Sequence, residues 1–312
     1  MRYCFGVDIG GTTVKLGIFE EDGLVVEKWE IPTYTENEGV RILPDIAASI
    51  REKIGAHHLE VSDCLGIGVG VPAPVTGAGV VNGSANLGWK YKEVKKELEK
   101  LTRIPAAVGN DANVAALGEM WKGAGKGRQN MIMITLGTGV GGGIIVGGRV
   151  ITGEHGAGGE VGHICVNYSE TDHCGCGNQG CLEQYASATG IVRLAKQKLE
   201  KETRDTLLTR GEITAKAVFD AVKEGDAVAM EVAEQFGEYL GSGLAILAAV
   251  ADPAVFVIGG GVSKAGEVLL GYIRKYYEKR AFFANKQMEF ALASLGNDAG
   301  IYGAAKLSLD RQ

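Results

Sequence analysis

Two short glycine-rich segments, each placed between two strand-like runs, constrain the fold of this chain more than any other feature. Residues 8–15 (DIGGTTVK) join the runs YCFGVDI and VKLGIFE, and residues 136–143 (LGTGVGGG) occupy the same kind of turn in the second half. Glycine makes up 48 of the 312 residues and gathers in such clusters. Because glycine has no Cβ, these clusters indicate backbone that closely approaches a ligand.

The first segment carries the groups that bind a nucleotide phosphate. Two glycines present backbone N–H groups without a Cβ in the way, two threonine hydroxyls add donors, and the aspartate at the strand end can hold a hydrated Mg²⁺. The expected cofactor-binding residues of this segment are Asp8, Gly10, Gly11, Thr12, Thr13 and Lys15. An ordinary glycine hairpin is the alternative interpretation. A P-loop or a dinucleotide fold is disfavoured, because the glycines turn into a strand instead of opening a helix.

Two further glycine clusters extend the expected nucleotide site. Two facing phosphate hairpins fit one nucleotide in a cleft, so we expect Thr138 and Gly139 to bind it as well. The third cluster, Gly259, Gly260 and Gly261, closes an apolar strand and opens a helix, where an adenosine or phosphate could rest against the helix N-terminus. Tight strand-to-helix turns also use glycine for packing, and that structural interpretation stays open for the third cluster.

The order of strand-like and helix-like segments predicts an α/β fold with two similar halves. The first half contains a three-stranded meander, a helix, a strand, a helix and a strand, at residues 2–31, 37–56, 65–71, 91–101 and 106–110. The second half repeats the plan from residue 130, with helices over most of 180–250, and it ends on a helix that begins near residue 299.

The charge of the chain argues for small-molecule partners. The formal net charge is -6 and the sequence pI is about 5.5, so no basic field draws the chain to nucleic acid or to an anionic membrane. The apolar run at the N-terminus is too short for a signal peptide or a membrane span. We therefore expect a cytoplasmic protein without nucleic-acid or membrane partners.

The segment Gly109-Asn110-Asp111-Ala112-Asn113 stands where a strand ends and a helix begins. Polar side chains at such a junction are exposed at the end of the sheet, and Asp111 can accept a proton there. The alternative role for this residue is a helix N-cap, which aspartate and asparagine fill routinely.

A compact group of one histidine and three cysteines predicts a metal site. His163 lies eleven residues before the run C-G-C-x4-C, whose cysteines are Cys174, Cys176 and Cys181. Three thiolates and one imidazole form a closed tetrahedral Zn²⁺ set, which favours a structural metal and leaves no open position for a hydrolytic water. A disulfide is the main competitor, although three cysteines cannot all pair among themselves. His173 is a possible substitute for His163.

These segments together resemble a known protein family. The segments are DIGGTTVK at 8–15, GNDAN at 109–113, LGTGVGGG at 136–143, EHGAGGEVGH at 154–163, CGCGNQGCLEQYAS at 174–187 and IGGGVS at 258–263. Over nearly the whole chain they resemble the ROK family of repressors and sugar kinases, and its bacterial glucokinase branch most of all.

The resemblance implies two actin-like, ribonuclease-H-like α/β domains whose interdomain cleft closes on ATP and a sugar. A small domain would span 1–108, with the C-terminal helix of about 299–312 returning to it, and a large domain would span 109–298 and carry the zinc loop. Asp111 would be the base that takes the sugar hydroxyl proton, and His163 would serve both zinc and sugar. The substrate-binding residues that the resemblance implies are Asn86, Asn110, Asp111, Glu160, His163 and Glu183.

The expected activity is an ATP-dependent kinase that phosphorylates glucose at the 6-hydroxyl, with a catalytic Mg²⁺ and a structural Zn²⁺. Other sugars stay open as alternatives, because Asn, Glu and His suit many hydroxyl patterns: fructose, N-acetylmannosamine, N-acetylglucosamine and allose. Polyphosphate is an alternative donor, because the same glycine loops would bind it.

Two non-catalytic functions are alternatives to the kinase. A catalytically silent sugar sensor is disfavoured, because Asp8, Asp111 and both phosphate loops are present. The family's repressors carry an N-terminal helix-turn-helix, whereas here the phosphate loop begins at residue 8, so a transcription regulator is not expected. The resemblance also implies a homodimer or a homotetramer.

Overall fold

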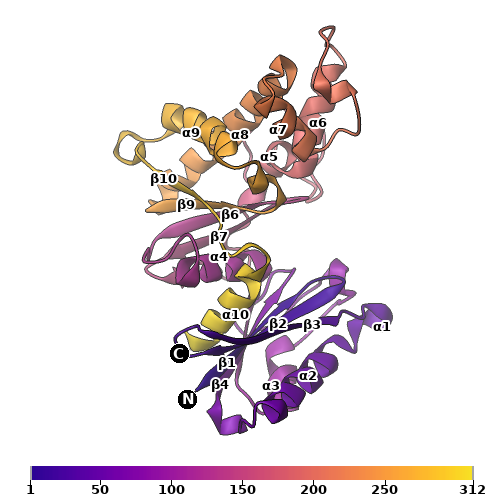
Figure 1. Cartoon of the computed structure of the whole chain (residues 1–312), viewed down its shortest axis with the longest axis vertical. Helices are drawn as coiled ribbons and strands as arrows, with labels where there is room; N and C mark the ends of the chain where they lie inside the picture. The colour runs from indigo at the N-terminus through magenta and orange to yellow at the C-terminus, as the bar shows by residue number, and fades with distance from the viewer. Residues whose placement is uncertain (1, 311–312) are drawn as a thin grey trace. The chain divides into compact units, whose positions relative to one another are not determined.

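The structure is a computed structural model that describes residues 2–310, and this part of the chain contains two five-stranded sheets with helices packed on them (Figure 1). It forms two compact units. The first comprises residues 2–127, 143–159 and 294–310, and the second comprises Arg128–Gly142 and Glu160–Ala293. Among these residues, no helix combines the length and the apolar character that a membrane span needs.

The first sheet is built on the predicted meander. Its strands are β1 (Tyr3–Ile9), β2 (Thr13–Glu20), β3 (Val25–Pro32), β4 (Cys64–Val71) and β5 (Ala106–Asn110). The order is β3-β2-β1-β4-β5, with β2 antiparallel to its two neighbours and β4 parallel to β1 and β5. The central strand β1 is largely buried and apolar, whereas the edge strand β3 alternates between half-buried and exposed residues, as a strand with one covered face does.

The second sheet repeats the topology of the first. Its strands are β6 (Met131–Leu136), β7 (Val140–Val146), β8 (Arg149–Val150), β9 (Val255–Gly259) and β10 (Glu289–Leu292). Read from the other edge, the order β10-β9-β6-β7-β8 follows the same path through its strands as the order of the first sheet. The predicted α/β class and the topological repeat are therefore confirmed.

The helices of the first unit are α1 (Glu36–Gly39), α2 (Ile42–Ala56), α3 (Val94–Thr102), α4 (Asp111–Lys122) and α10 (Ala299–Leu309). Isoleucines in α2 recur at Ile42, Ile46, Ile50 and Ile54, a four-residue spacing that puts one buried stripe against the sheet. The helical stretch predicted near 37–56 is confirmed over 42–56, whereas its first residues are irregular. Asn37 and Glu38, inside α1, have left-handed φ angles of 51° and 60°, so this short segment does not form a regular α-helical turn that continues into α2.

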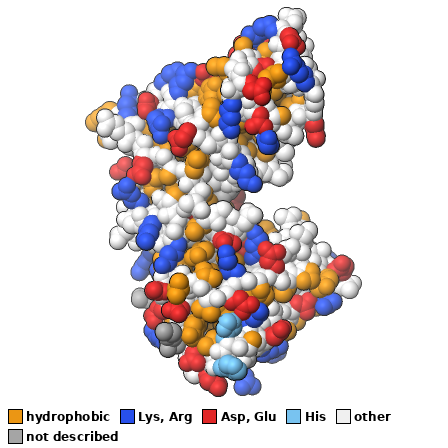
Figure 2. Space-filling view, in the orientation of Figure 1, with side chains coloured by type: hydrophobic (Ala, Val, Ile, Leu, Met, Phe, Trp, Pro, Cys, Tyr) orange, Lys and Arg blue, Asp and Glu red, His pale blue; other side chains and the backbone are white. Residues whose placement is uncertain are grey.

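Helices dominate the second unit, as the sequence predicted for 180–250. They are α5 (Glu183–Ala186), α6 (Ala188–Leu199), α7 (Ala215–Lys223), α8 (Ala227–Ala251) and α9 (Glu267–Arg280). Short 3-10 helices occur at Val61–Asp63, Ala85–Leu87, Val161–His163, Leu207–Thr209, Gly261–Ala265, Phe283–Asn285 and Gly296–Asp298. Lys and Arg side chains alternate with Asp and Glu over the face drawn in Figure 2, in keeping with the absence of a basic field.

Helix α10 packs on α4 and on strands β1 and β4 at distances that only glycine allows. A Cβ at Gly68 of β4 would lie 1.6 Å from the carbonyl oxygen of Ala304, and a Cβ at Gly303 would lie 1.6 Å from that of Val114. A Cβ at Gly118 of α4 would meet α10 backbone at 2.2 Å. Backbone atoms cannot rotate away as a flexible side chain does, so any larger residue at these positions has to push the elements apart.

A fully buried carboxylate ties the end of α4 to the segment that leads into α10. Glu119 has no exposed surface, and its carboxylate accepts backbone N–H groups of Ala124 at 2.8 Å, of Ser294 at 3.0 Å and of Leu295 at 2.8 Å. These bonds compensate for the desolvation of the carboxylate. The first unit therefore includes α4 and extends past residue 108, where the sequence places the domain boundary. That boundary stays a prediction about the folding domains.

Replacing Gly303 with alanine should destabilise the protein by about 3 kcal/mol, because the new methyl group has to displace the backbone of α4. Gly55→Ala in α2 is the matched control, since nothing lies within 4 Å of its Cβ position and alanine favours a helix. Chemical denaturation measures both. Equal stabilities for the two variants would contradict the packing described for α10.

Candidate active site and metal centre

The first glycine loop is a tight, closed turn between β1 and β2. The N–H of Gly10 donates to the carbonyl of Thr13 at 3.0 Å, and the hydroxyl of Thr33 donates to the carbonyl of Gly10 at 2.8 Å. Gly11 and Thr12 are exposed at its tip. The loop is thus held from behind while its outer side stays open to an anion.

Asn86, which only the family resemblance implied as a site residue, lies beside this loop. It sits in the 3-10 helix Ala85–Leu87, its side chain is exposed, and its carbonyl oxygen would be 3.5 Å from a Cβ placed on Gly11. The structure therefore brings two of the predicted site residues together within the first unit.

Asp8 is a largely buried carboxylate at the end of β1. Burial, and after it the nearby charge of Asp111, raise its pKa to about 6, whereas the charge of Lys15 opposes the shift. Lys15 faces Asp8 across the antiparallel pair, and its ammonium group donates to the carbonyl of Asn297 at 3.2 Å. A Cβ on Gly300, in the first turn of α10, would lie 2.4 Å from a carboxylate oxygen of Asp8. Two acidic groups in one place favour a cation between or beside them.

The junction of β5 and α4 shows which residue is the helix N-cap, a role that the sequence left open for Asp111. Asn110 is the N-cap of α4, because its side-chain oxygen accepts the N–H of Ala112 at 3.0 Å and that of Asn113 at 3.2 Å. Asp111 is the first helical residue, and one of its carboxylate oxygens accepts the N–H of Ala112 at 2.8 Å. Since Asn110 caps the helix, the N-cap interpretation of Asp111 was wrong.

The second glycine loop, in the second unit, is braced by residues around α5 and α6. The N–H of Gly137 donates to the carbonyl of Gly139 at 3.0 Å, and the hydroxyl of Thr189 donates to the carbonyl of Thr138 at 2.8 Å. A carboxylate oxygen of Glu183 accepts the N–H of Val140 at 2.9 Å. Glu183, predicted as a sugar ligand, therefore also supports the loop that was predicted to bind phosphate.

The third glycine cluster differs from the prediction. Gly261 opens a 3-10 helix that ends at Ala265, and α9 begins only at Glu267, because Gly266 between them has a φ of 81°. The expectation of an α-helix N-terminus directly after the cluster was wrong. Gly260 has a φ of 83°, and a Cβ on it would lie 2.5 Å from the backbone of Leu136, so packing requires glycine there.

The histidine and the three cysteines meet in one place. The ligand atoms of His163, Cys174, Cys176 and Cys181 all lie within 4.8 Å of one another. The Sγ atoms of Cys176 and Cys181 are 3.7 Å apart, and Nδ1 of His163 is 3.8 Å from Sγ of Cys174. Sulfur atoms 2.3 Å from a tetrahedral Zn²⁺ are about 3.8 Å apart, so the geometry fits this metal.

The contacts of the two histidines show that His163, and not His173, belongs to this group of ligand atoms. Nδ1 of His173 lies 3.0 Å from the carbonyl of Gly177, outside the cluster, whereas Nε2 of His163 lies 3.9 Å from the carboxylate of Glu160. Burial raises the pKa of Cys174 and raises that of Cys181 to about 12, so these thiols ionise readily only with a cation beside them.

Three side chains near the Cys3His group were not predicted from the sequence. They are Glu170, Tyr185 and Arg193, which form a hydrogen-bonded and ionic network behind the metal ligands. Tyr185 lies within one of the quoted motifs, but tyrosine, glutamate and arginine are common in ordinary surfaces and cores. No spacing in the sequence signals that these three meet.

The chain is similar to known proteins over its full length. The ROK family model matches residues 4–311. A glucokinase of Halalkalibacterium halodurans is 44% identical over 312 residues, which cover 98% of this chain and 94% of that protein. A glucokinase of Streptomyces coelicolor is 37% identical over 318 residues, covering 99% and 98% of the two chains.

A solved structure agrees with this likeness. The crystal structure of a ROK family glucokinase from Streptomyces griseus in complex with glucose and AMPPNP has 37% sequence identity to this chain, covers 98% of both chains and superposes with a TM-score of 0.76. The family model and these relatives all span nearly the whole sequence, and we conclude that the chain belongs to the ROK family.

Proposed function

We propose that this protein is an ATP-dependent kinase that phosphorylates glucose at the 6-hydroxyl. The observation that carries this function is the full-length likeness to a ROK glucokinase solved with glucose and AMPPNP. The two braced glycine loops, the acidic residues Asp8 and Asp111 and the Cys3His group support it from within the chain.

Asp111 acts as the general base. Its carboxylate stands at the end of β5 and is not needed to cap α4, because Asn110 fills that position. In the proposed reaction it accepts the proton of the 6-hydroxyl while the hydroxyl oxygen attacks the γ-phosphorus and ADP leaves. Phosphoryl transfer needs little covalent help, so the main task of the protein is to hold the hydroxyl in line with the γ-phosphate.

The phosphates of ATP are bound by the glycine loops. Backbone N–H groups and hydroxyls of Gly11, Thr12 and Thr13 and of Thr138 and Gly139 donate to phosphate oxygens, while the N–H of Gly10 closes the first loop. The third cluster, Gly259 to Gly261, lies against the adenosine. Asp8 would hold a hydrated Mg²⁺, and this ion would supply positive charge against the phosphates. Lys15 adds a positive charge beside Asp8.

The sugar hydroxyls are recognised by amide, carboxylate and imidazole groups. The proposed ligands besides Asp111 are Asn86, Asn110, Glu160, His163 and Glu183. His163 directs Nδ1 toward the cysteines and Nε2 toward Glu160, so one ring can belong to the metal group and to the sugar site. Zinc in this Cys3His set is structural, because four protein ligands leave no position for a water.

The location, oligomeric state and domain bounds of the enzyme are also part of what we propose. We place it in the cytoplasm as a homodimer or homotetramer, with a small domain at 1–108 that includes the C-terminal helix and a large domain at 109–298. These statements rest on the family to which the chain belongs.

A coupled assay for ADP release tests the function. Mg²⁺-ATP is supplied with glucose, fructose, mannose, allose, N-acetylglucosamine or N-acetylmannosamine in turn. Glucose should give the highest kcat/KM by tenfold or more, which is about 1.4 kcal/mol of transition-state discrimination. A higher value for another sugar would change the substrate, and no release with any sugar would refute the kinase.

The variant Asp111→Asn should lower kcat about 100-fold or more while leaving glucose affinity nearly unchanged, because it removes the base and keeps the shape. Asp205→Asn is the matched control, since this exposed carboxylate pairs only with Arg210 among the described contacts of the second unit. Steady-state kinetics and glucose titration calorimetry measure the two effects. Wild-type turnover in Asp111→Asn would remove this residue from the mechanism.

The variant Asp8→Asn should lower activity and yet stabilise the protein when EDTA is present and nucleotide is absent. The folded-state pKa of Asp8, about 6, lies above the ordinary value of 3.8, so its ionised form costs stability above pH 6 and this cost fades as the pH falls toward 4. At pH 7.5 the gain should reach at most about 3 kcal/mol. Denaturation at pH 7.5 and pH 4.5 measures it, and a gain that does not shrink at the lower pH would contradict this account of Asp8.

A further inference from the structure

The loop of residues 164–182, here called the metal loop, carries the three cysteines of the Cys3His group and has little regular structure of its own. Isolated bridges pair Cys165 with Cys181 and His173 with Gln179. In small metal-binding segments the metal commonly supplies the order that such a loop lacks. This loop contains another source of order, which involves none of the four metal ligands.

The carboxylate of Glu170 is at the centre of the contacts that order the metal loop independently of the metal ligands. Its side chain is 8% exposed, and it forms an ion pair with Arg193 of α6. The hydroxyl of Tyr185 donates to it at 2.5 Å, and the N–H groups of Thr171 and Asp172 donate to its other oxygen at 2.9 and 3.0 Å. Burial alone would raise the pKa of Glu170, but the bonds from Tyr185 and Arg193 outweigh it and lower the pKa to about 2.

Tyr185 connects this carboxylate to the rest of the second unit. It is buried in α5, two residues after Glu183, and its ring stacks on that of Tyr239 of α8 with 3.9 Å between centroids. Its oxygen also accepts the side-chain N–H of Asn167 at 2.9 Å. The metal loop is thereby joined at two points, Asn167 and Glu170, to a ring that is fixed by packing.

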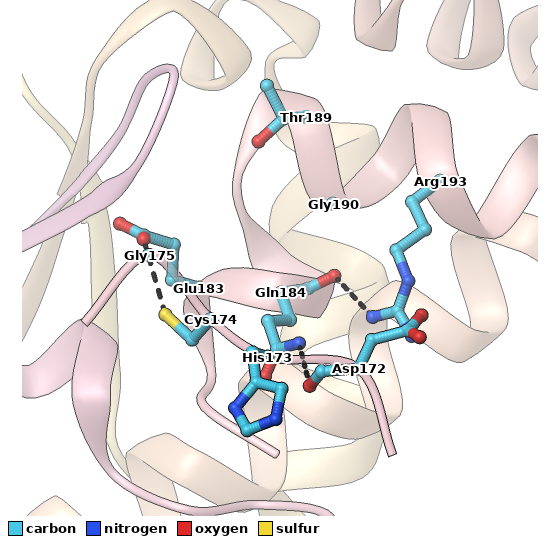
Figure 3. Close-up of a pocket in the computed structure, with 9 residues that line it drawn as sticks. All are labelled: Asp172, His173, Cys174, Gly175, Glu183, Gln184, Thr189, Gly190 and Arg193. Carbon is cyan, nitrogen blue, oxygen red and sulfur yellow. Dashed lines mark hydrogen bonds and ion pairs between the residues drawn. The ribbon is translucent and has the colours of Figure 1, made fainter. Parts of the chain in front are cut away.

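Arg193 joins the far end of the loop to α6. Besides Glu170, it pairs with Asp172 at 3.2 Å and donates to the carbonyl of Gln184 at 3.4 Å. In Figure 3, Arg193 lies next to Asp172 and Gln184, whereas Cys174 and Glu183 lie on the opposite side of the view. All of these residues line a cavity of about 330 Å³. The side chain of Gln184 in turn accepts the N–H of the ligand Cys181 at 3.0 Å.

We propose that Glu170, Tyr185 and Arg193 form a metal-independent anchor that holds the metal loop in place before zinc binds. They are positioning residues, because they order the cysteines and Glu183 without contacting the metal. The proposal rests on the zinc site and the sugar site proposed above. A buried ion pair with all its partners present is rigid, and removing one partner leaves a buried charge uncompensated.

Hydrogen exchange of the zinc-free protein tests the anchor directly. Peptides within residues 164–186 should stay protected in the chelator-treated wild type and should lose at least tenfold of that protection in Glu170→Gln and Arg193→Lys. Arg204→Lys is the matched control, because Arg204 also pairs with two carboxylates, Glu202 and Glu231, away from the metal group. Exchange in the zinc-free wild type as fast as in the two variants would overturn the proposal.

Zinc affinity, measured by competition with a chromophoric chelator, gives a second readout. Loss of the anchor should weaken zinc binding 10- to 100-fold, the usual effect of residues that orient metal ligands, and should raise KM for glucose more than it lowers kcat. Tyr185→Phe keeps the stacked ring and removes one hydroxyl, so it reports on the anchor even if the charged variants fold poorly. Zinc affinity in Tyr185→Phe equal to that of the Arg204→Lys control would count against the anchor.

The two proposals fail in different ways. Hydrogen exchange requires neither ATP nor sugar, so an inactive wild type would refute the kinase and leave the anchor result unaffected. Conversely, an active kinase whose zinc-free loop exchanges freely would refute the anchor alone.

Discussion

The close approach of α10 to α4 and to the first sheet is the constraint on which the arrangement of Asp8 and Asp111 in the first unit depends. Glycines at Gly68, Gly118 and Gly303 let backbone meet backbone, and Gly300 at the start of α10 leaves room for the carboxylate of Asp8. The same helix therefore fixes strand β1, which carries Asp8 near its end, and helix α4, which begins with Asp111. Two carboxylates are held near one another by packing against their electrostatic preference, which is what a cation-assisted phosphoryl transfer needs.

In the second unit, polar contacts hold the second glycine loop and the metal loop in place. Glu183 supports the second glycine loop through Val140 and lies beside Cys174, so this loop and the Cys3His group share one side chain. The metal loop is held in addition by Glu170 and its partners. Rigid support of this kind suits an enzyme whose catalytic contribution is mainly to position its substrates and to stabilise developing charge.

The sequence predicted those features that are encoded locally. Strands, glycine turns and the Cys3His group follow from short-range patterns, and both sheets appear where the patterns placed them. The break at Asn37 and the 3-10 helix at Gly261 were missed, because left-handed residues and tight helical turns leave weak compositional signals. Asn110 rather than Asp111 caps α4, a choice between adjacent polar residues that only the backbone geometry decides. The pairing of Glu170 with Arg193 joins residues that no periodicity relates.

The most direct test of the central claim is to identify the product made from glucose and ATP. Phosphorus and proton NMR of the reaction mixture assign the phosphorylated carbon without relying on a coupling enzyme. Direct transfer of the γ-phosphoryl group to the 6-hydroxyl, with Asp111 accepting the hydroxyl proton, predicts glucose 6-phosphate and ADP in equal amounts. Phosphate on another hydroxyl, or inorganic phosphate released with unmodified glucose, would contradict the proposed geometry of the site.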